Sequence, residues 1–264
     1  MRDAVVRAVK VGISAAVLAI DSAVGAVAPA RRRGRRATGV VLMYHDVAPA
    51  HRAAFAAQCD LIARLGVPTA AADMERPADG SWRVAWTFDD AFRSFAEEAV
   101  PEMEARAIPS TLFVPTEWSR RADDPDADFP GLSPDRLAAL PPSVEVASHS
   151  RSHPRLPELD DASLAEELAG SRAELEEMVG RPVRTHAFPY GEHDPRVDAA
   201  ARAAGYERCY GIVPTLATDG DDFVVGRVQV DPWDWPVEVR LKALGAYRWM
   251  AWWMHARRGP ASGR

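Results

Sequence analysis

The sequence predicts an α/β protein built around a parallel, TIM-like barrel of about seven strands. From position 39 onward, short runs rich in β-branched and aromatic residues alternate with longer stretches of helical period, and Gly, Pro or Asp separates them. No GxGxxG follows the first predicted strand and no GxxxxGK[ST] occurs, which argues against an open nucleotide-binding sheet. In a parallel barrel, reactive side chains belong at the carboxyl ends of the strands.

The elements follow in order along the chain. The predicted strands span 40–44, 83–88, 110–114, 144–148, 184–188, 207–210 and 223–230, and the predicted helices span 53–65, 93–107, 134–140, 164–179, 195–204 and 237–253. The fourth helix has the clearest signals. Ser163 and Glu166 form a capping box at its start, Gly180 ends it, and one apolar face is lined by Leu164, Leu168, Leu175 and Met178.

The composition favours one catalytic domain over residues 38–264. The chain has 264 residues and 47% hydrophobic side chains, enough for one large core. A formal net charge of -6 argues against a nucleic-acid partner, and the one dense basic run, at positions 31–36, is typical of a linker or of the flank of a membrane segment. Cys59 and Cys209 match no metal-binding spacing and are interpreted as reduced core residues, with a disulfide as the alternative.

Residues 1–37 form an apolar and basic leader or a membrane-proximal helix. Positions 11–30 are weakly apolar and interrupted by Asp21, which makes a poor membrane span, and Ala26-Val27-Ala28 has the small-x-small form of a signal-peptide cleavage site. Three interpretations stay open, namely a cleaved leader, attachment to a membrane surface and a soluble amphipathic helix. A cytoplasmic, a membrane-associated and a secreted location therefore also stay open.

Two clusters of polar residues follow predicted strands. Asp89 and Asp90 come directly after 83–88, where one carboxylate can bind a metal ion and the other can serve as a base; a solvated turn or a helix N-cap is the alternative. His149 and His153 follow 144–148 at a spacing of four, which suits one zinc ion or a first-row neighbour but also occurs on ordinary helices. Phe188-Pro189-Tyr190-Gly191, taken alone, is typical of a tight turn.

Together these motifs resemble those of polysaccharide deacetylases with a NodB-type domain, a carbohydrate esterase family 4-like group. The resemblance rests on Thr87-Phe88-Asp89-Asp90, on the segment from Ser148 to His153 and on Phe188-Pro189-Tyr190-Gly191, in the family's order. The segment from Leu42 to Val47 resembles the exopolysaccharide branch. The resemblance covers about residues 39–250 and implies a distorted (β/α) barrel that hydrolyses carbon–nitrogen bonds in an acetylated glycan such as a polymer of N-acetylglucosamine.

The resemblance also implies roles for individual residues. Asp90, His149 and His153 are expected to hold one divalent ion, zinc first, with cobalt, nickel or manganese as alternatives. Asp89 is expected to act as the general base, and the backbone N–H of Tyr190 to stabilise the oxyanion.

The sequence departs from the family pattern at three places. Ala91 stands where the first motif usually ends in Gly. Ala187 and Phe188 stand where an Arg would orient the base, so Arg227 or Arg184 is the candidate replacement. The late Leu-x-His has no counterpart.

The general acid is therefore assigned by position. His45 is the candidate because it closes the first strand. His193 is a weaker one, while His186 lies inside a strand and His255 in a terminal helix.

Aromatic and acidic residues outside these motifs have several interpretations. Asp231-Pro232-Trp233-Asp234-Trp235 resembles an Asp-x-x-Asp-Trp element, whose indoles stack on a sugar or, as we prefer, pack at the end of the barrel. Helical spacing indicates that Tyr247, Trp249, Trp252 and Trp253 are core or membrane-facing residues. Asp124, Asp126 and Asp128 do not form an EF-hand, because Phe129 occupies the Gly position and Asp135 that of the bidentate Glu.

The sequence thus predicts a metal-dependent hydrolase that removes N-acetyl or O-acetyl groups from a glycan. Two alternatives remain, an amidohydrolase or esterase acting on a non-sugar acyl compound and a catalytically weak barrel that only binds a glycan. The expected partner is the acetylated glycan, together with membrane-surface association through the N-terminal segment and no nucleic acid.

Overall fold

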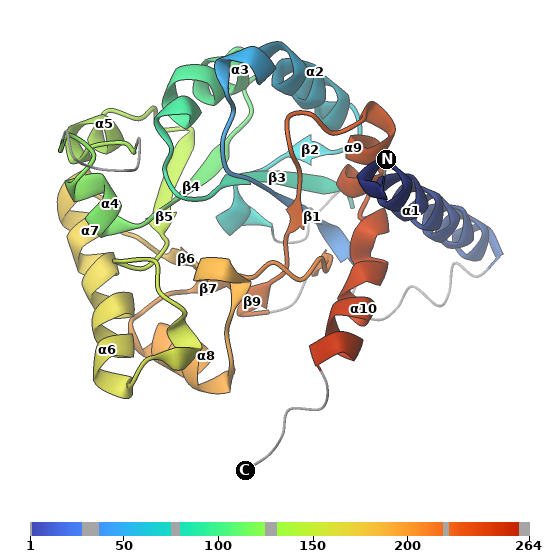
Figure 1. Cartoon of the computed structure of the whole chain (residues 1–264). Helices are drawn as coiled ribbons and strands as arrows, with labels where there is room; N and C mark the ends of the chain where they lie inside the picture. Colours follow the sequence, from blue (N-terminus) through green and yellow to red (C-terminus); the bar gives the residue numbers. More distant parts are fainter. Residues whose placement is uncertain (1, 28–36, 75–79, 125–130, 219–221, 259–264) are drawn as a thin grey trace.

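The computed structural model describes residues 2–27, 37–74, 80–124, 131–218 and 222–258. It shows a mixed α/β fold in which a ring of strands is surrounded by helices, with α1 (Arg2–Val27) and α10 (Trp249–Arg258) on the same side (Figure 1). The predicted fold class, a distorted (β/α) barrel, is confirmed.

Eight strands follow one another around the sheet in the order β10-β1-β3-β4-β5-β6-β7-β9 and pair in parallel. Two short strands pair outside this path, β2 with β3 and β8, antiparallel, with β1. The bounds are β1 Ala37–Tyr44, β2 Val67–Pro68, β3 Arg83–Phe88, β4 Ser110–Val114, β5 Val144–Ser148, β6 Thr185–Ala187, β7 Arg208–Tyr210, β8 Ala217–Thr218, β9 Val224–Val225 and β10 Val228–Gln229.

The barrel nearly closes between β9 and β10, where the sequence predicted one strand over 223–230. Gly226 and Arg227 separate the two short strands, and these strands end the sheet on opposite sides. A Cβ atom on Gly226 would lie 1.8 Å from the carbonyl oxygen of Val213, so the chain can bend this closely only at glycine. The bend turns one predicted strand into the two edges of the barrel and places Arg227 at its mouth.

Two groups of buried residues form the core. The smaller group fills the barrel and contains small side chains beside two large rings, among them Ala85, Ala147, Ala187, Phe113 and Tyr210. The larger group lies between the strands and the surrounding helices. Along each parallel strand, residues belong alternately to the inner and the outer group. Polar residues that follow the carboxyl ends of these strands therefore lie at the mouth of the barrel.

The helices differ from the predictions mainly at their ends. Their bounds are α2 Arg52–Ala63, α3 Val100–Glu104, α4 Thr116–Arg120, α5 Pro134–Ala138, α6 Asp161–Ala165, α7 Ser171–Val179, α8 Pro195–Ala203 and α9 Pro236–Ala243. Short π-helical turns at Phe95–Ala99 and Glu166–Gly170 precede α3 and join α6 to α7. The predicted helix over 237–253 is broken at Gly245, which has a φ of +70°.

The predicted capping box of Ser163 and Glu166 is wrong. The side chain of Asp160 caps α6 instead, accepting a hydrogen bond from the backbone N–H of Ser163 at 2.7 Å. The helix therefore begins earlier than predicted and Ser163 lies inside it. Its end at Gly180, in the left-handed conformation, and the burial of Leu164, Leu168 and Leu175 agree with the prediction.

Three further predictions concern the cysteines, the membrane and the acidic segment. Cys59 and Cys209 are free and buried, as predicted. Among the described helices, none is long and apolar enough to cross a membrane. The acidic positions 126 and 128 lie outside the described residues.

Candidate metal centre and active site

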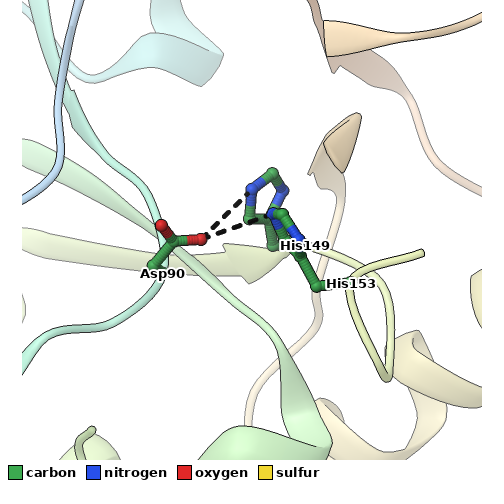
Figure 2. A group of neighbouring side chains, drawn as sticks. All are labelled: Asp90, His149 and His153. Atoms are coloured by element: carbon green, nitrogen blue, oxygen red, sulfur yellow. Dashed lines mark ion pairs between the residues drawn. The ribbon is translucent and has the colours of Figure 1, made fainter. Parts of the chain in front are cut away.

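The candidate site lies where the carboxyl ends of neighbouring strands meet. Asp89 and Asp90 follow β3, His149 follows β5 and Tyr190 follows β6, and these strands lie within the consecutive run β3-β4-β5-β6 of the sheet. His153 reaches the same place on the loop after His149. Figure 2 shows the carboxylate of Asp90 pointing at both imidazole rings.

The distances between the three ligand atoms suit one small ion. Asp90 Oδ1 lies 3.6 Å from His149 Nε2 and 3.5 Å from His153 Nε2, and the three atoms lie within 4.8 Å of one another. Around a tetrahedral zinc ion, ligand atoms stand about 3.3 Å apart. Asp90 Oδ1 is buried and has no hydrogen-bond partner. A buried, unpartnered carboxylate oxygen facing two imidazoles fits a divalent cation.

Burial keeps both imidazoles neutral, as metal binding requires. Removal from water lowers the pKa of His149 to about 3, and burial also lowers the pKa of His153. His149 Nδ1 lies 2.7 Å from the carbonyl oxygen of Ala187, which fixes the hydrogen on Nδ1 and leaves the Nε2 lone pair for a metal. Burial and the neighbouring charge of Asp89 raise the pKa of Asp90 to about 6.

Asp89 is held by a buried arginine. Both its oxygens accept hydrogen bonds from Arg227, at 2.6 and 2.8 Å, and the guanidinium is fully buried. Arg227 also donates to Thr87 Oγ1 and to the carbonyl oxygen of Gly211. Burial is the largest effect on Asp89 and opposes its ionisation, but the charge and hydrogen bonds of Arg227 and the neighbouring histidines together outweigh it, so the pKa of Asp89 is lowered. Asp89 is therefore an ionised carboxylate, 4.0 Å from His149 Nε2.

The ion pair between Arg227 and Asp89 identifies the arginine that takes the place of the missing motif Arg. Arg227 enters from the bend between β9 and β10, whereas Arg184 is exposed and faces Glu207 at 3.8 Å. Of the two candidates from the sequence, Arg227 orients Asp89 and Arg184 does not.

The candidate histidines occupy different places. His45 is partly buried after β1 and acts electrostatically on Asp89, Asp90 and His153, which places it at the same rim. His193 faces Asp198 at 2.9 Å and stacks on Phe188, and His186 is fully buried within β6. His45 is thus the candidate acid that the fold brings to the carboxylates.

Tyr190 lies beside His153 at the candidate metal site. Its ring meets that of His153 edge to face, with centroids 4.7 Å apart. The guanidinium carbon of Arg155 lies over the Tyr190 ring, 4.8 Å from the ring centroid. The ring is half exposed, and the backbone φ of Tyr190 is +58°. Pro189 before it and Gly191 after it permit this turn.

Backbone strain concentrates in these loops. In the described part of the chain, six non-glycine residues have a positive φ, and five of them belong to the three motifs, namely Asp90, Ala91, Ser150, His153 and Tyr190. Ala91 has a φ of +56° where the family has Gly. Because such conformations persist only where the surroundings enforce them, the loops hold the site in a fixed shape.

Two further residues of the site were missed by the sequence interpretation. Trp118, on the unpredicted helix α4, places its ring 5.1 Å from that of His153. Glu167, on the π-helical turn, accepts hydrogen bonds from the backbone N–H groups of Arg151 and Ser152, at 2.8 and 3.1 Å, and from the Ser152 hydroxyl. Glu167 thereby fixes the loop between the two histidines.

The indoles after β10 are more exposed than predicted. Trp233 is 56% exposed and lies beside His51, and Trp235 is 41% exposed under the guanidinium of Arg7. The preferred interpretation, packing at the end of the barrel, is therefore wrong for both rings. Between them, Asp234 is partly buried and pairs with Lys242 and Arg7.

Comparisons with known proteins identify the family and support the fold. A family model for polysaccharide deacetylases matches residues 77–209. The chain is similar to the structure of IcaB from Ammonifex degensii, with 27% sequence identity, a TM-score of 0.66, and coverage of 79% of this chain and 99% of that one. A search of curated protein sequences gives no match.

Two more distant structures share the fold. They are the deacetylase PplD from Streptococcus pyogenes in complex with acetate, at 16% identity and a TM-score of 0.67, and a de-N-acetylase from Aggregatibacter actinomycetemcomitans, at 18% identity and 0.62. The matches cover 78% and 74% of this chain, and 99% and 96% of the other chains.

Proposed function

Because the chain belongs to the polysaccharide deacetylase family, whose members are hydrolases of carbon–nitrogen bonds, we propose that it removes N-acetyl groups from a glycan with one divalent ion and with Asp89 as the base. The observation that carries the proposal is the ionised Asp89, locked by Arg227 beside the group of Asp90, His149 and His153. A barrel that only bound a glycan would need neither the buried carboxylate nor its buried partner.

Asp90, His149 and His153 would hold the ion. An ion bound there would lower the pKa of a water molecule and polarise the acetyl carbonyl group. Zinc is the expected ion, because two imidazoles and one carboxylate form a common zinc ligand set with positions left for water and substrate. Cobalt, nickel and manganese are the alternatives.

The chain's own residues account for the proton transfers. Asp89 accepts a proton from the attacking water as the water oxygen bonds to the acetyl carbon. The backbone N–H of Tyr190 donates a hydrogen bond to the carbonyl oxygen as that oxygen gains negative charge. The carbon–nitrogen bond then breaks, and the leaving nitrogen takes a proton, for which His45 is the donor. Acetate and a free amine on the sugar are the products.

Aromatic side chains beside the candidate metal site support a sugar substrate. The rings of Trp118 and Tyr190 both contact that of His153, and Tyr190 is half exposed. Flat apolar rings stack on the CH face of a pyranose, while Arg155 offers donors to its hydroxyl groups. N-acetylglucosamine polymers are therefore the first substrates to test.

The test is acetate release by the full chain from N-acetylglucosamine oligomers. The protein is treated with a chelator and then given zinc, cobalt, nickel or manganese, beside an Asp89→Asn variant. We expect acetate to be lost on chelation, restored by one of these ions, and lost again in the variant.

Two other outcomes would favour the alternative functions. One bound ion per chain without acetate, but with acyl release from a non-sugar ester or amide, would indicate an amidohydrolase or esterase. Glycan binding without any acyl release would indicate a barrel that only binds. The absence of a nucleic-acid partner stays a prediction, as does membrane-surface association.

A further inference from the structure

The helix α1 exposes an apolar face. Val5, Val9, Ile13 and Ile20 are between 40% and 61% exposed and, at 100° per residue, fall within about 80° of the helix circumference. Ser14, on the other side of the helix, is fully buried. A helix that belonged only to the barrel would turn this aliphatic face inward, so the face is available to something outside the fold.

α1 is fixed to the barrel by its polar face. Arg7 pairs with Asp234 at 2.8 Å and with Glu238, and Asp21 pairs with Arg248 at 2.5 Å. Ser14 accepts a hydrogen bond from the indole of Trp249 on α10. These contacts with α9 and α10 thus hold α1 so that its apolar face points away from the barrel.

α10 adds indoles to the same region. Trp252 is 76% exposed and Trp253 is 40% exposed, on the helix that Trp249 joins to α1. Figure 1 shows α1 and α10 together at one side of the barrel. Indole side chains favour the headgroup region of a bilayer, where one end of the ring is apolar and the other is wet.

Positive and negative charge are unevenly divided between the two terminal segments of the sequence, which include α1 and α10, and the rest of the chain. Segments 1–37 and 245–264 hold twelve of the 32 Lys and Arg residues but two of the 38 Asp and Glu residues, a net charge of +10. The other residues hold the remaining 20 basic and 36 acidic side chains, a net charge of -16. An anionic surface would therefore attract these two terminal segments of the sequence and repel the rest of the chain.

We propose that the α1/α10 surface, defined by Val5, Val9, Ile13, Ile20, Trp252 and Trp253, docks on the anionic surface of a lipid bilayer. The aliphatic face enters the boundary between headgroups and acyl chains, and the basic segments contact the headgroups. Docking orients the barrel relative to the bilayer and does not require a spanning helix.

A pocket lies between α1 and α10 on one side and Arg227, the partner of Asp89, on the other. Its volume is about 500 Å³, and its walls include Lys10 of α1, Met254 of α10, Trp233 and, at the barrel mouth, Arg227. Arg227 holds Asp89, so the pocket reaches the positioning partner of the proposed base. If the proposed deacetylation is correct, on which this step rests, the substrate is a glycan held at the membrane surface.

The test measures binding of the full chain to phosphatidylcholine vesicles with and without phosphatidylglycerol, by co-sedimentation at low and high salt. We expect binding that needs the anionic lipid and weakens with salt. The double variant Val9→Asp, Ile13→Asp should bind at least about tenfold more weakly. Val67→Asp, a similarly exposed valine on β2, should leave the affinity unchanged.

Asp89→Asn separates this proposal from the proposed function. The variant should bind vesicles like the wild type, because the measurement does not depend on catalysis. Binding that ignores the lipid charge, or that survives the double Asp substitution in a folded protein, would overturn the proposal. Self-association that the double variant abolishes, without vesicle binding, would show that the face belongs to a second copy of the chain.

Discussion

Replacing Arg227 tests the electrostatic design of the site. In Arg227→Met, an apolar side chain of similar volume takes the place of a fully buried guanidinium, and the carboxylate of Asp89 keeps its burial but loses both charge-assisted hydrogen bonds. Removing one partner of a buried ion pair costs about 3–5 kcal/mol, because an uncompensated charge is left behind. We expect a loss of this size in the free energy of unfolding.

The same substitution should change the protonation of the proposed base. In the wild type, Arg227 makes the largest contribution that lowers the pKa of Asp89 and opposes the effect of burial. Without Arg227 only burial and weaker charges act, so the pKa of Asp89 should rise and the ionised fraction of the carboxylate should fall. Acetate release should then fall, and its acidic limb should move to higher pH.

Urea unfolding and the pH profile of acetate release measure these two effects. Arg184→Met is the matched control, because Arg184 is exposed and its pair with Glu207 spans 3.8 Å, and we expect a change within about 0.5 kcal/mol. Asp89→Asn combined with Arg227→Met should recover part of the lost stability, since no unpaired charge remains. A loss below about 1 kcal/mol in Arg227→Met, with an unchanged pH profile, would refute the reasoning.

Three further predictions concern the candidate metal site. Because the pKa of Asp90 is raised to about 6, an ion must displace its proton at lower pH, so metal affinity should rise with pH up to about 6 and then level, as chelator competition would measure. Glu167→Ala should weaken metal binding about tenfold or more by releasing the loop between the histidines, whereas Glu166→Ala, which removes a hydrogen bond to the exposed end of the Arg151 side chain, should leave the affinity unchanged. Ala91→Gly should stabilise the chain by up to about 1 kcal/mol in thermal unfolding, because the residue has a φ of +56°; destabilisation would show that the turn is not strained.

The polar residues of the site and most strands could be predicted from local sequence. The strands at 83–88, 110–114 and 144–148 have the predicted bounds, because their apolar runs are long and end sharply in polar residues. Asp89, Asp90, His149 and His153 follow two of them, so the rule that parallel strands end at one rim placed these side chains together.

Contacts between distant segments could not be predicted in the same way. Arg227 was one of two candidates, and only the bend at Gly226, set by the close approach of Val213, determines that it reaches Asp89. Trp118 and Glu167 lie on a short helix and a π-helical turn, which have no strong periodic signal. Two-residue strands such as β9 are defined by their pairing partners and not by their own composition.

The most direct test of the proposed mechanism separates metal binding from base catalysis. Metal content per chain and acetate release would be measured together for the wild type, Asp89→Asn and Asp90→Asn, each reconstituted with zinc after chelation. The mechanism predicts that Asp89→Asn keeps one ion per chain and loses acetate release, whereas Asp90→Asn loses the ion as well. Full acetate release by a folded Asp89→Asn variant, or a retained ion and activity in Asp90→Asn, would contradict it.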